Sequence, residues 1–306
     1  MRYIELFVVA GIIILYSGLA HQRNIVWKGD ISLWKDCVSK SPDKFRPHNN
    51  LGYAYLENKD YDRAMDEFRE TLRLNPRAEK AYLNIGRIYE EKGQIGDAIK
   101  NYNKALEIAP NFTEAFHFLG NVYENQRLLD MAMLYYEKAG RKKPDDPKLL
   151  LSLGSVLHKK GYFREAVNNY NMALKSNPDM PEAYYNLGLA YDERGLFNEA
   201  LYYYQQALKL KPTYPQALSN MGIIYGKMGR LEEAVDLFKK ALNIKPDDAI
   251  TLLDMGFSYE QLAGRYEPAE IGKDLRVKAI QTYQRVLDLE PDNMQAKERM
   301  TRLMSH

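Results

Sequence analysis

The sequence predicts an all-α fold, a solenoid of seven repeated helix–turn–helix units. The main observation is that glycine, proline and alanine each recur at one fixed step of 34 positions, in three different registers. The recurring glycines, which we call the register glycines, are Gly52, Gly86, Gly120, Gly154, Gly188, Gly222 and Gly256. The prolines run from Pro42 to Pro246 and the alanines from Ala64 to Ala234 at the same step. Such a period indicates one supersecondary unit that is repeated along the chain.

Each unit shows the spacing of two amphipathic helices. In the fifth unit, Tyr184, Leu187 and Tyr191 form one apolar stripe, and Ala200 and Tyr204 begin a second. Apolar residues three and four positions apart lie on one face of a helix. Each unit is therefore predicted to be an antiparallel pair of helices.

Glycine and proline mark where these helices are expected to end and begin. A glycine suited to stop the first helix is found at Gly93, Gly161, Gly195 and Gly229. A proline suited to the first helical turn, where its missing N–H is not needed, is found at Pro147, Pro181 and Pro215. These residues predict where the two helices of each pair are separated.

The register glycines lie in the middle of the predicted first helices, where glycine costs about 1 kcal/mol relative to alanine. We expect close approach of a neighbouring helix to offset this cost. The recurring alanine of the second helix is expected at the same crossing. Aromatic residues are expected to fill the wider gaps between helices, and these are Tyr102, Tyr136, Tyr170, Tyr204, Phe238 and Tyr283.

With this pattern the chain resembles the tetratricopeptide repeat (TPR) family, whose unit is a helix–turn–helix of about 34 residues. Residues 181–212, PEAYYNLGLAYDERGLFNEALYYYQQALKLKP, carry the resemblance clearly. The seven units are residues 45–78, 79–112, 113–146, 147–180, 181–214, 215–248 and 249–293. The resemblance implies a right-handed superhelix of stacked hairpins, in which the first helices line a concave groove.

The seventh unit is longer than the others. The step from Pro246 to Pro291 exceeds the period by 11 positions, which places an insertion of that length within 262–272. Because the insertion lies between the two helices of one hairpin, we expect a longer connecting turn that contains Pro268. It is either a tolerated surface insertion, since lengthening a loop costs little free energy, or a contact for a partner.

Residues 294–306 are expected to form a helix that caps the last hairpin. Met294, Met300 and either Leu303 or Met304 would lie on its buried face. At the other end, residues 23–44 are predicted to be a juxtamembrane segment and a degenerate half repeat. Trp34 precedes Phe68 by one period, so residues 31–40 are expected to form a second helix that packs on the first full hairpin.

Residues 6–22 carry no formal charge at any position. A bilayer span needs about 20 apolar residues, with a lower limit near 17, and this stretch just reaches the limit. We therefore predict that residues 1–22 form a transmembrane helix or signal anchor. The alternatives are a cleaved signal peptide and a buried core helix.

The side of the membrane on which the repeats lie is open. Basic residues are more frequent after the apolar segment than before it, which favours cytoplasmic repeats. Residues 23–52, however, resemble the junction between the last membrane helix and the TPR tail of multi-pass glycosyltransferase-like membrane proteins. That resemblance implies a periplasmic or other extracytoplasmic tail.

Composition and motifs exclude several classes of protein. A hydrophobic content of 45% excludes a disordered polar chain, and one cysteine excludes an intramolecular disulfide scaffold. A net charge of +2 gives no strong attraction to nucleic acids. The sequence contains no phosphate-binding glycine loop, no nucleophile elbow and no metal-binding cysteine pair. We therefore predict no enzymatic activity, no catalytic residues, no metal and no cofactor.

Function is expected at the positions that the resemblance to the TPR family implies to face the groove. These groove positions are the residue two before and the residue just after each register glycine. The candidate peptide-binding residues, at or beside these positions, are Asn50, Asn84, Asn121, Asn186, Asn220, Tyr53, Phe118, Tyr185, Leu189, Ile223 and Phe257. An asparagine amide both donates and accepts hydrogen bonds, which suits the backbone of an extended peptide. This face resembles the asparagine ladder in the repeat domain of O-linked N-acetylglucosamine transferases. The same amides can instead bond to the neighbouring hairpin.

Three hypotheses for function follow from these predictions. The first is a membrane-anchored, non-enzymatic scaffold that binds extended segments of partner proteins in its groove. The second is an accessory or detached TPR tail of a membrane glycosyltransferase system. The third is a homo-oligomer in which the C-terminal helix of one copy fills the groove of the next.

Overall fold

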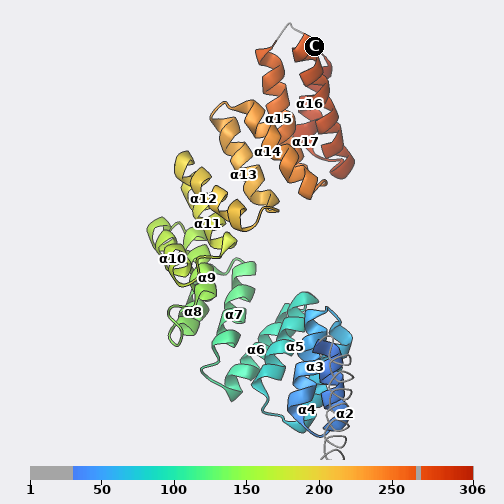
Figure 1. Cartoon of the computed structure of the whole chain (residues 1–306), viewed down its shortest axis with the longest axis vertical. Coiled ribbons are helices and arrows are strands. Elements are labelled where there is room, and N and C mark those ends of the chain that lie inside the picture. Colours follow the sequence, from blue (N-terminus) through green and yellow to red (C-terminus); the bar gives the residue numbers. More distant parts are fainter. Residues whose placement is uncertain (1–29, 267–269, 306) are drawn as a thin grey trace, which may run out of the picture. The chain divides into compact units, whose positions relative to one another are not determined.

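The computed structural model describes residues 30–266 and 270–305, and every regular element in these ranges is an α-helix. With the labels of Figure 1, the first helices along the chain are α2 (Asp30–Lys40), α3 (Phe45–Glu57), α4 (Tyr61–Leu74), α5 (Glu79–Glu91), α6 (Ile95–Ile108), α7 (Thr113–Asn125) and α8 (Leu129–Gly140). They are followed by α9 (Pro147–Lys159), α10 (Phe163–Ser176), α11 (Pro181–Glu193), α12 (Phe197–Leu210), α13 (Pro215–Lys227), α14 (Leu231–Ile244), α15 (Ala249–Arg265), α16 (Glu270–Leu289) and α17 (Met294–Met304). The predicted all-α class is confirmed.

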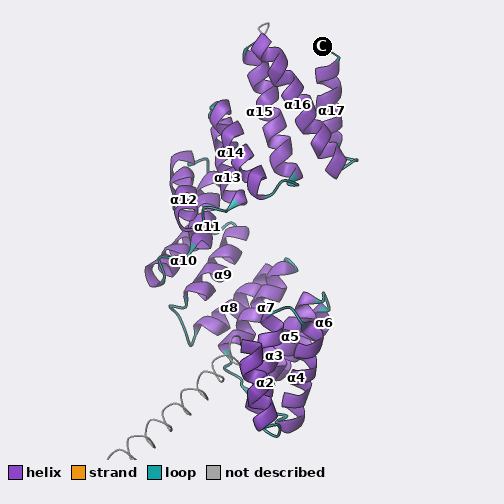
Figure 2. Ribbon diagram, turned by 45° about the vertical axis from the view of Figure 1, so that its right-hand side comes forward, coloured by secondary structure: helices purple, strands orange, loops and turns teal. Residues whose placement is uncertain are grey.

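The chain divides into two compact units, with the boundary between Pro144 and Asp145. Consecutive helices pair as hairpins, from α3 with α4 to α7 with α8 in the first unit, and from α9 with α10 to α15 with α16 in the second (Figures 1 and 2). Within a unit, the second helix of one hairpin packs on the first helix of the next. The right-handed superhelix stays a prediction.

A residue with positive φ ends the first helix of most hairpins. The glycines at this point, with φ between 71° and 82°, are Gly93, Gly161, Gly195 and Gly229. Lys59 and Arg127 take the same place in the first and third hairpins, with φ of 59° and 61°. Glycine is favoured here because it has no Cβ to clash in the left-handed region. The four predicted stop glycines are confirmed.

The start of three first helices is fixed by proline. Pro147, Pro181 and Pro215 are the first residues of α9, α11 and α13, as predicted. Their φ angle already suits a helix, and the first turn leaves its N–H groups without partners in any case.

Each register glycine lies against an aromatic ring from the second helix of its own hairpin. A Cβ atom added to Gly188 would lie 2.5 Å from carbons of the Tyr204 ring, and one added to Gly52 would lie 2.8 Å from the Phe68 ring. Real Cβ atoms do not approach so closely, so only glycine admits the ring. This corrects the packing expected from the sequence: the ring fills the crossing itself, rather than a wider gap elsewhere.

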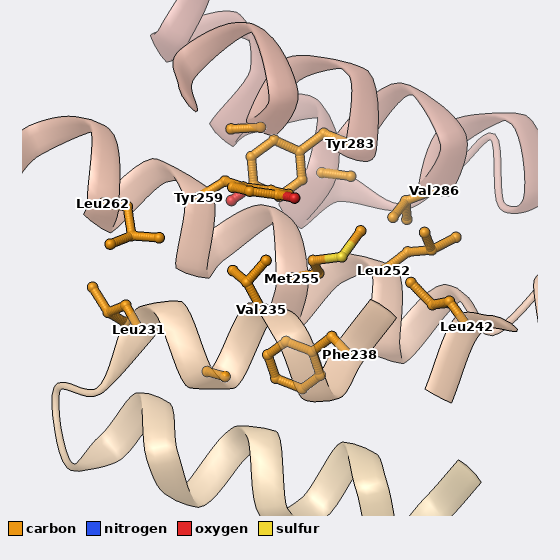
Figure 3. Packing of buried hydrophobic residues seen from close by; sticks show 13 residues of the cluster. Leu231, Val235, Phe238, Leu242, Leu252, Met255, Tyr259, Leu262, Tyr283 and Val286 are labelled. Carbon is orange, nitrogen blue, oxygen red and sulfur yellow. The ribbon is translucent and has the colours of Figure 1, made fainter. Parts of the chain in front are cut away.

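Figure 3 shows the buried hydrophobic side chains where α14, α15 and α16 meet. Phe238, Met255, Tyr259 and Tyr283 belong to one buried cluster, which Val286 of α16 also joins. Tyr283 lies on Gly256 despite the insertion between them. A Cβ atom added to Gly256 would lie 2.7 Å from the Tyr283 ring. The core of the second unit is therefore shared between neighbouring hairpins.

The insertion in the seventh unit lengthens the helices, and in this respect the expectation of a longer turn was wrong. α15 has 17 residues, four more than α13, and α16 has 20, six more than α14. Leu262 and Ala263 are buried and extend the apolar face of α15, so continued helix gains packing. A Cβ on Gly272 would lie 3.1 Å from the carbonyl oxygens of Ala263 and Tyr266, so Gly272 permits the close contact. Pro268 lies outside the described residues.

Atypical helices lie at the ends of the two units. In the first, Ile31, Trp34 and Val38 of α2 pack against the buried cluster that surrounds Phe68. α2 spans Asp30–Lys40, so it begins one residue before the helix that the sequence predicts over residues 31–40.

In the second unit, α17 packs on α16, with Ala296 fully buried and with Met300 and Leu303 against the cluster of α14 to α16. Met294 and Met304 are 73% and 68% exposed. Met294 therefore does not belong to the buried face to which the sequence assigned it.

No helix within residues 30–266 and 270–305 is long and apolar enough to cross a bilayer. The predicted transmembrane helix, residues 1–22, lies outside these ranges, as do residues 23–29 of the juxtamembrane segment.

The crossing predicts opposite effects for alanine at two glycines of first helices. Gly188→Ala should lower the free energy of unfolding by about 1–3 kcal/mol, because the Cβ must displace the Tyr204 ring. Gly226→Ala should raise it by up to about 1 kcal/mol, because its Cβ meets no atom within 4 Å and alanine favours helix. Urea unfolding followed by circular dichroism measures both, and similar effects of the two substitutions would contradict this packing.

Candidate peptide-binding site

The groove positions lie on the first helix of each hairpin. In the first unit they belong to α3, α5 and α7, and in the second to α9, α11, α13 and α15. In each unit the side chains at these positions fall into two groups, those already bonded within the fold and those available to a ligand.

Two of the five predicted asparagines, Asn50 and Asn186, keep amide groups available, whereas Asn84 is buried. Asn186 on α11 is partly buried and has no hydrogen-bond partner among the described residues. Asn50 on α3 accepts only a long bond of 3.4 Å from Asn49 Nδ2. Asn84 is 5% exposed, and its Oδ1 accepts at 3.4 Å from Arg87.

Asn121 and Asn220 are bonded within the fold. The Tyr136 hydroxyl lies 2.7 Å from Asn121 Oδ1. Asn220 Nδ2 donates to the hydroxyls of Tyr185 and Tyr204, at 3.2 Å and 3.3 Å, and both tyrosines belong to the preceding hairpin. For Asn220 the structure therefore shows the alternative that the sequence left open. A peptide contact for any of the five stays a prediction.

A pocket of about 330 Å³, the α3–α5 pocket, lies beside Asn50. Its lining residues are Phe45, Arg46, Asn49, Asn50, Asn75, Ala78, Glu79 and Lys80. Asn49 Oδ1 is buried and has no hydrogen-bond partner in the described part of the chain. A buried polar atom without a partner costs about 1–3 kcal/mol, so a shift of the Asn49 side chain that brings Oδ1 to a ligand donor would be favoured. Sequence reasoning missed Asn49, although the adjacent asparagines were a signal.

Arg87 connects two predicted aromatic residues of the first unit. Its guanidinium carbon lies 5.7 Å from the centre of the Tyr53 ring and 5.5 Å from that of Phe118. Its Nη2 bonds to Glu57 at 3.2 Å. Phe118 also stacks on the Tyr102 ring, with centres 5.6 Å apart, whereas Tyr53 is 46% exposed. Of the two, Tyr53 offers the larger surface to a ligand.

In the second unit, Tyr185 and Leu189 take part in packing. Burial raises the pKa of Tyr185, and its ring centre lies 4.9 Å from that of Tyr214. Tyr185 and Leu189 both pack against the buried cluster that contains Tyr204 and Tyr214. The other two predicted residues, Ile223 and Phe257, line a second pocket, and Phe257 is 39% exposed.

Three hairpins share a hydrogen bond between the buried tyrosine and a carboxylate four residues after the register glycine. The hydroxyl–carboxylate distances are 2.7 Å for Tyr102 and Glu90, 2.7 Å for Tyr136 and Glu124, and 2.9 Å for Tyr283 and Glu260. Burial, and then the charge of Glu90, raise the pKa of Tyr102 far above its ordinary value, which keeps the phenol neutral as the donor. These pairs fill the space beside the groove positions in their hairpins.

The hairpin of α13 and α14 lacks this pair, because Phe238 stands in place of the tyrosine and Gly226 in place of the carboxylate. Here lies the second pocket, the α13–α15 pocket, with a volume of about 380 Å³. Its lining residues are Gly222, Ile223, Gly226, Lys227, Leu231, Phe238, Asp254, Phe257, Ser258 and Gln261. The missing side chains therefore leave space for a ligand.

Asp254 gives this pocket a titratable carboxyl group at a groove position. Burial and then the charge of Asp248 raise its pKa to about 6, against a lowering by Lys227. No described residue donates a hydrogen bond to the Asp254 carboxyl. The Lys227 ammonium, which lines the same pocket, is bonded to Asp192 instead, at 3.2 Å. Asp254 lies two residues before Gly256 and is therefore a groove position, to which the sequence assigned no role.

Residues 30–266 and 270–305 contain no group of three His, Cys, Asp or Glu side chains that is arranged to hold a metal ion. The absence of an enzymatic activity, a metal site and a cofactor stays a prediction.

The raised pKa predicts how stability depends on pH. The folded state holds the Asp254 proton up to about pH 6, whereas the unfolded chain releases it near 3.8, so stability falls as pH rises through this window. At pH 7, Asp254→Asn should therefore stabilise the protein by about 1–2 kcal/mol, a value reduced for solvent screening. Below about pH 4 the difference should vanish. Urea unfolding from pH 3.5 to 8 tests this, with Asp236→Asn at an exposed site as the control; a constant difference at all pH values would contradict it.

Models of one repeat family match most of this repeat region. Models described as tetratricopeptide repeat match residues 45–78, 115–148, 151–215 and 215–248, and one described as TPR repeat matches residues 86–126. No curated protein sequence matches the chain.

Several solved structures have a similar fold. The crystal structure of the APC/C hetero-tetramer Cut9–Hcn1 has a TM-score of 0.70 at 17% identity, covering 90% of this chain and 52% of that one, so this chain spans about half its length. Pseudomonas aeruginosa pilF has a TM-score of 0.63 at 21% identity, covering 74% of this chain and 97% of that one. A tetratricopeptide repeat protein from Parabacteroides merdae ATCC 43184 has a TM-score of 0.61 at 14% identity, covering 85% and 98%. At these identities the likeness shows the fold alone.

The family models follow one another along the same units whose helix pairs the structure shows. The chain therefore belongs to the tetratricopeptide repeat family.

Proposed function

We propose that this chain is a scaffold whose groove positions bind extended segments of partner proteins. Proteins of the tetratricopeptide repeat family are generally scaffolds for protein–protein interaction. The proposal adds that the available amides and exposed rings at the groove positions form the contact surface.

The observation that carries the proposal is the set of unoccupied amide groups at and beside the groove positions. Asn186 has no hydrogen-bond partner among the described residues, and Asn49 Oδ1 is buried without one in the α3–α5 pocket, which Asn50 also lines. An extended peptide presents N–H and C=O groups along its length, and asparagine pairs with both. A partner backbone would therefore satisfy groups that the fold leaves open.

Exposed aromatic rings add apolar contact area for such a segment. Tyr53 in the first unit and Phe257 in the second are 46% and 39% exposed. Aromatic side chains dominate the energetics of many protein interfaces, because they bury a large area with few rotatable bonds.

We further propose that residues 1–22 anchor the scaffold in a membrane. The support is the stretch 6–22, which is free of formal charge and long enough for a short span. Charge bias favours a cytoplasmic repeat domain, whereas the resemblance of residues 23–52 favours an extracytoplasmic one. A role as the accessory tail of a membrane glycosyltransferase system rests on that junction and is the second hypothesis.

Self-assembly through the C-terminal helix is disfavoured by how α17 packs. Arg299 bonds to Glu260 of α15 at 3.0 Å, Arg302 pairs with the same carboxylate, and Ala296 is fully buried. A copy that inserted this helix into another groove would first have to break these contacts. Homo-oligomerisation stays a prediction.

The groove proposal is tested with peptides that the full-length protein, in detergent, selects from a random phage library of short peptides. Asn50 and Asn186 belong to different units, so a peptide bound to either unit loses one hydrogen bond when both are changed to alanine. Asn50→Ala combined with Asn186→Ala should therefore weaken binding of a selected peptide about fivefold, at roughly 1 kcal/mol for that bond. Fluorescence anisotropy of the labelled peptide measures the affinity, and circular dichroism checks the fold.

The matched control is Asn121→Ala combined with Asn220→Ala, which removes two amides that the fold already uses. This variant should have a lower thermal midpoint and nearly unchanged affinity. Equal losses of affinity in the two double variants, or no loss in the first, would refute the role of the available amides.

The anchor is tested by alkaline carbonate extraction of membranes from cells that express the full-length protein. The protein should stay in the membrane pellet, and a variant without residues 1–22 should be released. Release of the full-length protein would refute the anchor. Protease accessibility of the repeats in sealed vesicles then identifies their side of the membrane.

A further inference from the structure

The α13–α15 pocket owes its space to a substitution at two positions at once. In three other hairpins a tyrosine hydroxyl and a carboxylate fill the equivalent region, as Tyr102 and Glu90 do at a distance of 2.7 Å. Here Phe238 supplies no hydroxyl and Gly226 no side chain, while Phe238 keeps its contact with Gly222. The crossing is thus maintained, and the pocket of about 380 Å³ lies within the range of about 300–1,000 Å³ that is usual for ligand pockets.

One part of the wall of this pocket is apolar, and the rest is polar or charged. Ile223 on α13 and Phe257 on α15 line the apolar part together with Phe238 and Leu231 of α14. An aliphatic chain can therefore bury its methylene groups here.

Among the described residues no cation forms an ion pair with the Asp254 carboxylate, although the charge of Lys227 lowers its pKa. Lys227 lines the same pocket, but its Nζ bonds to Asp192 at 3.2 Å and lies 5.4 Å from the centre of the Phe197 ring. Arg299, whose guanidinium carbon lies 4.4 Å from the centre of the Phe257 ring, is bonded to Glu260 at 3.0 Å. Both nearby cations are thus engaged by other carboxylates.

We propose that the α13–α15 pocket binds a lysine or arginine side chain of the partner segment. The aliphatic stem of that side chain lies on Ile223 and Phe257, and its charged end pairs with Asp254. Long basic side chains bury their stems on apolar surface while the charge meets a polar group. The inference rests on the proposed function, because it names the chemistry of one side chain in the bound segment.

Other occupants fit the pocket less well. A purely apolar side chain would cover Asp254 and remove it from water without a partner, which is costly for a carboxylate. An acidic side chain would meet a like charge. A basic side chain compensates the carboxylate and uses the apolar walls.

The test uses peptides selected by the full-length protein, in detergent, from a random phage library of short peptides. The selected peptides should share a lysine or arginine at one position. Each is then compared with a version in which norleucine replaces that lysine, or citrulline that arginine, by fluorescence anisotropy. On the wild-type protein the loss of charge should weaken binding about tenfold, as expected for a partly buried ion pair.

Variants of the protein assign this effect to the pocket. On Asp254→Asn the charged and uncharged peptides should bind with nearly equal affinity, so that the double-mutant cycle isolates the pair. Gly226→Leu, which places a side chain into open space, should also abolish the preference while the protein stays folded by circular dichroism. Asp236→Asn, a matched change on α14 at an exposed aspartate, should keep the tenfold preference.

The outcomes separate this inference from the proposed function. Selected peptides without a shared basic residue, or an undiminished preference on Asp254→Asn, would overturn the inference and leave peptide binding intact. Failure of the wild-type protein to select any peptide would overturn both.

Discussion

The fold depends on the contact between each register glycine and one aromatic ring of the same hairpin. A Cβ on Gly86 would lie 2.5 Å from the Tyr102 ring, so the two helices can cross at this depth only because glycine is present. The ring is fully buried, and its hydroxyl reaches Glu90 at 2.7 Å, beside the groove positions. One contact therefore sets both the packing of the hairpin and the side chains available next to the groove positions.

Variation around that contact gives the groove positions their differences in chemistry. Gly222 and Phe238 keep the crossing, while the loss of a hydroxyl and of the side chain at Gly226 leaves a pocket with Asp254 at its wall. Because the crossing is unchanged, such a substitution alters what a repeat can bind without disturbing how it stacks. The available amide of Asn186 differs from that of Asn220 for a related reason, since no tyrosine hydroxyl of the described residues bonds to it.

Features that follow the repeat period could be predicted from the sequence, including the helix pairs and stop glycines such as Gly195. The effect of the insertion at 262–272 could not, because the preference for helix over a longer turn depends on tertiary packing of that segment. Which asparagine amides are hydrogen-bonded within the fold could not be predicted from the sequence either. The Asn220 amide donates hydrogen bonds to the hydroxyls of Tyr185 and Tyr204. Both tyrosines belong to the preceding hairpin and are not sequence neighbours of Asn220.

The central claim, that partner segments lie on the first helices, is tested most directly by photo-crosslinking. A selected peptide that carries benzophenone is irradiated with the full-length protein, and the crosslinked residues are located by mass spectrometry. Tyr53 on α3 and Tyr202 on α12 are 46% and 56% exposed, so accessibility does not favour the first helix. The account predicts crosslinks at first-helix residues such as Tyr53 and Phe257. Crosslinks concentrated on second helices, at residues such as Tyr202, would contradict it.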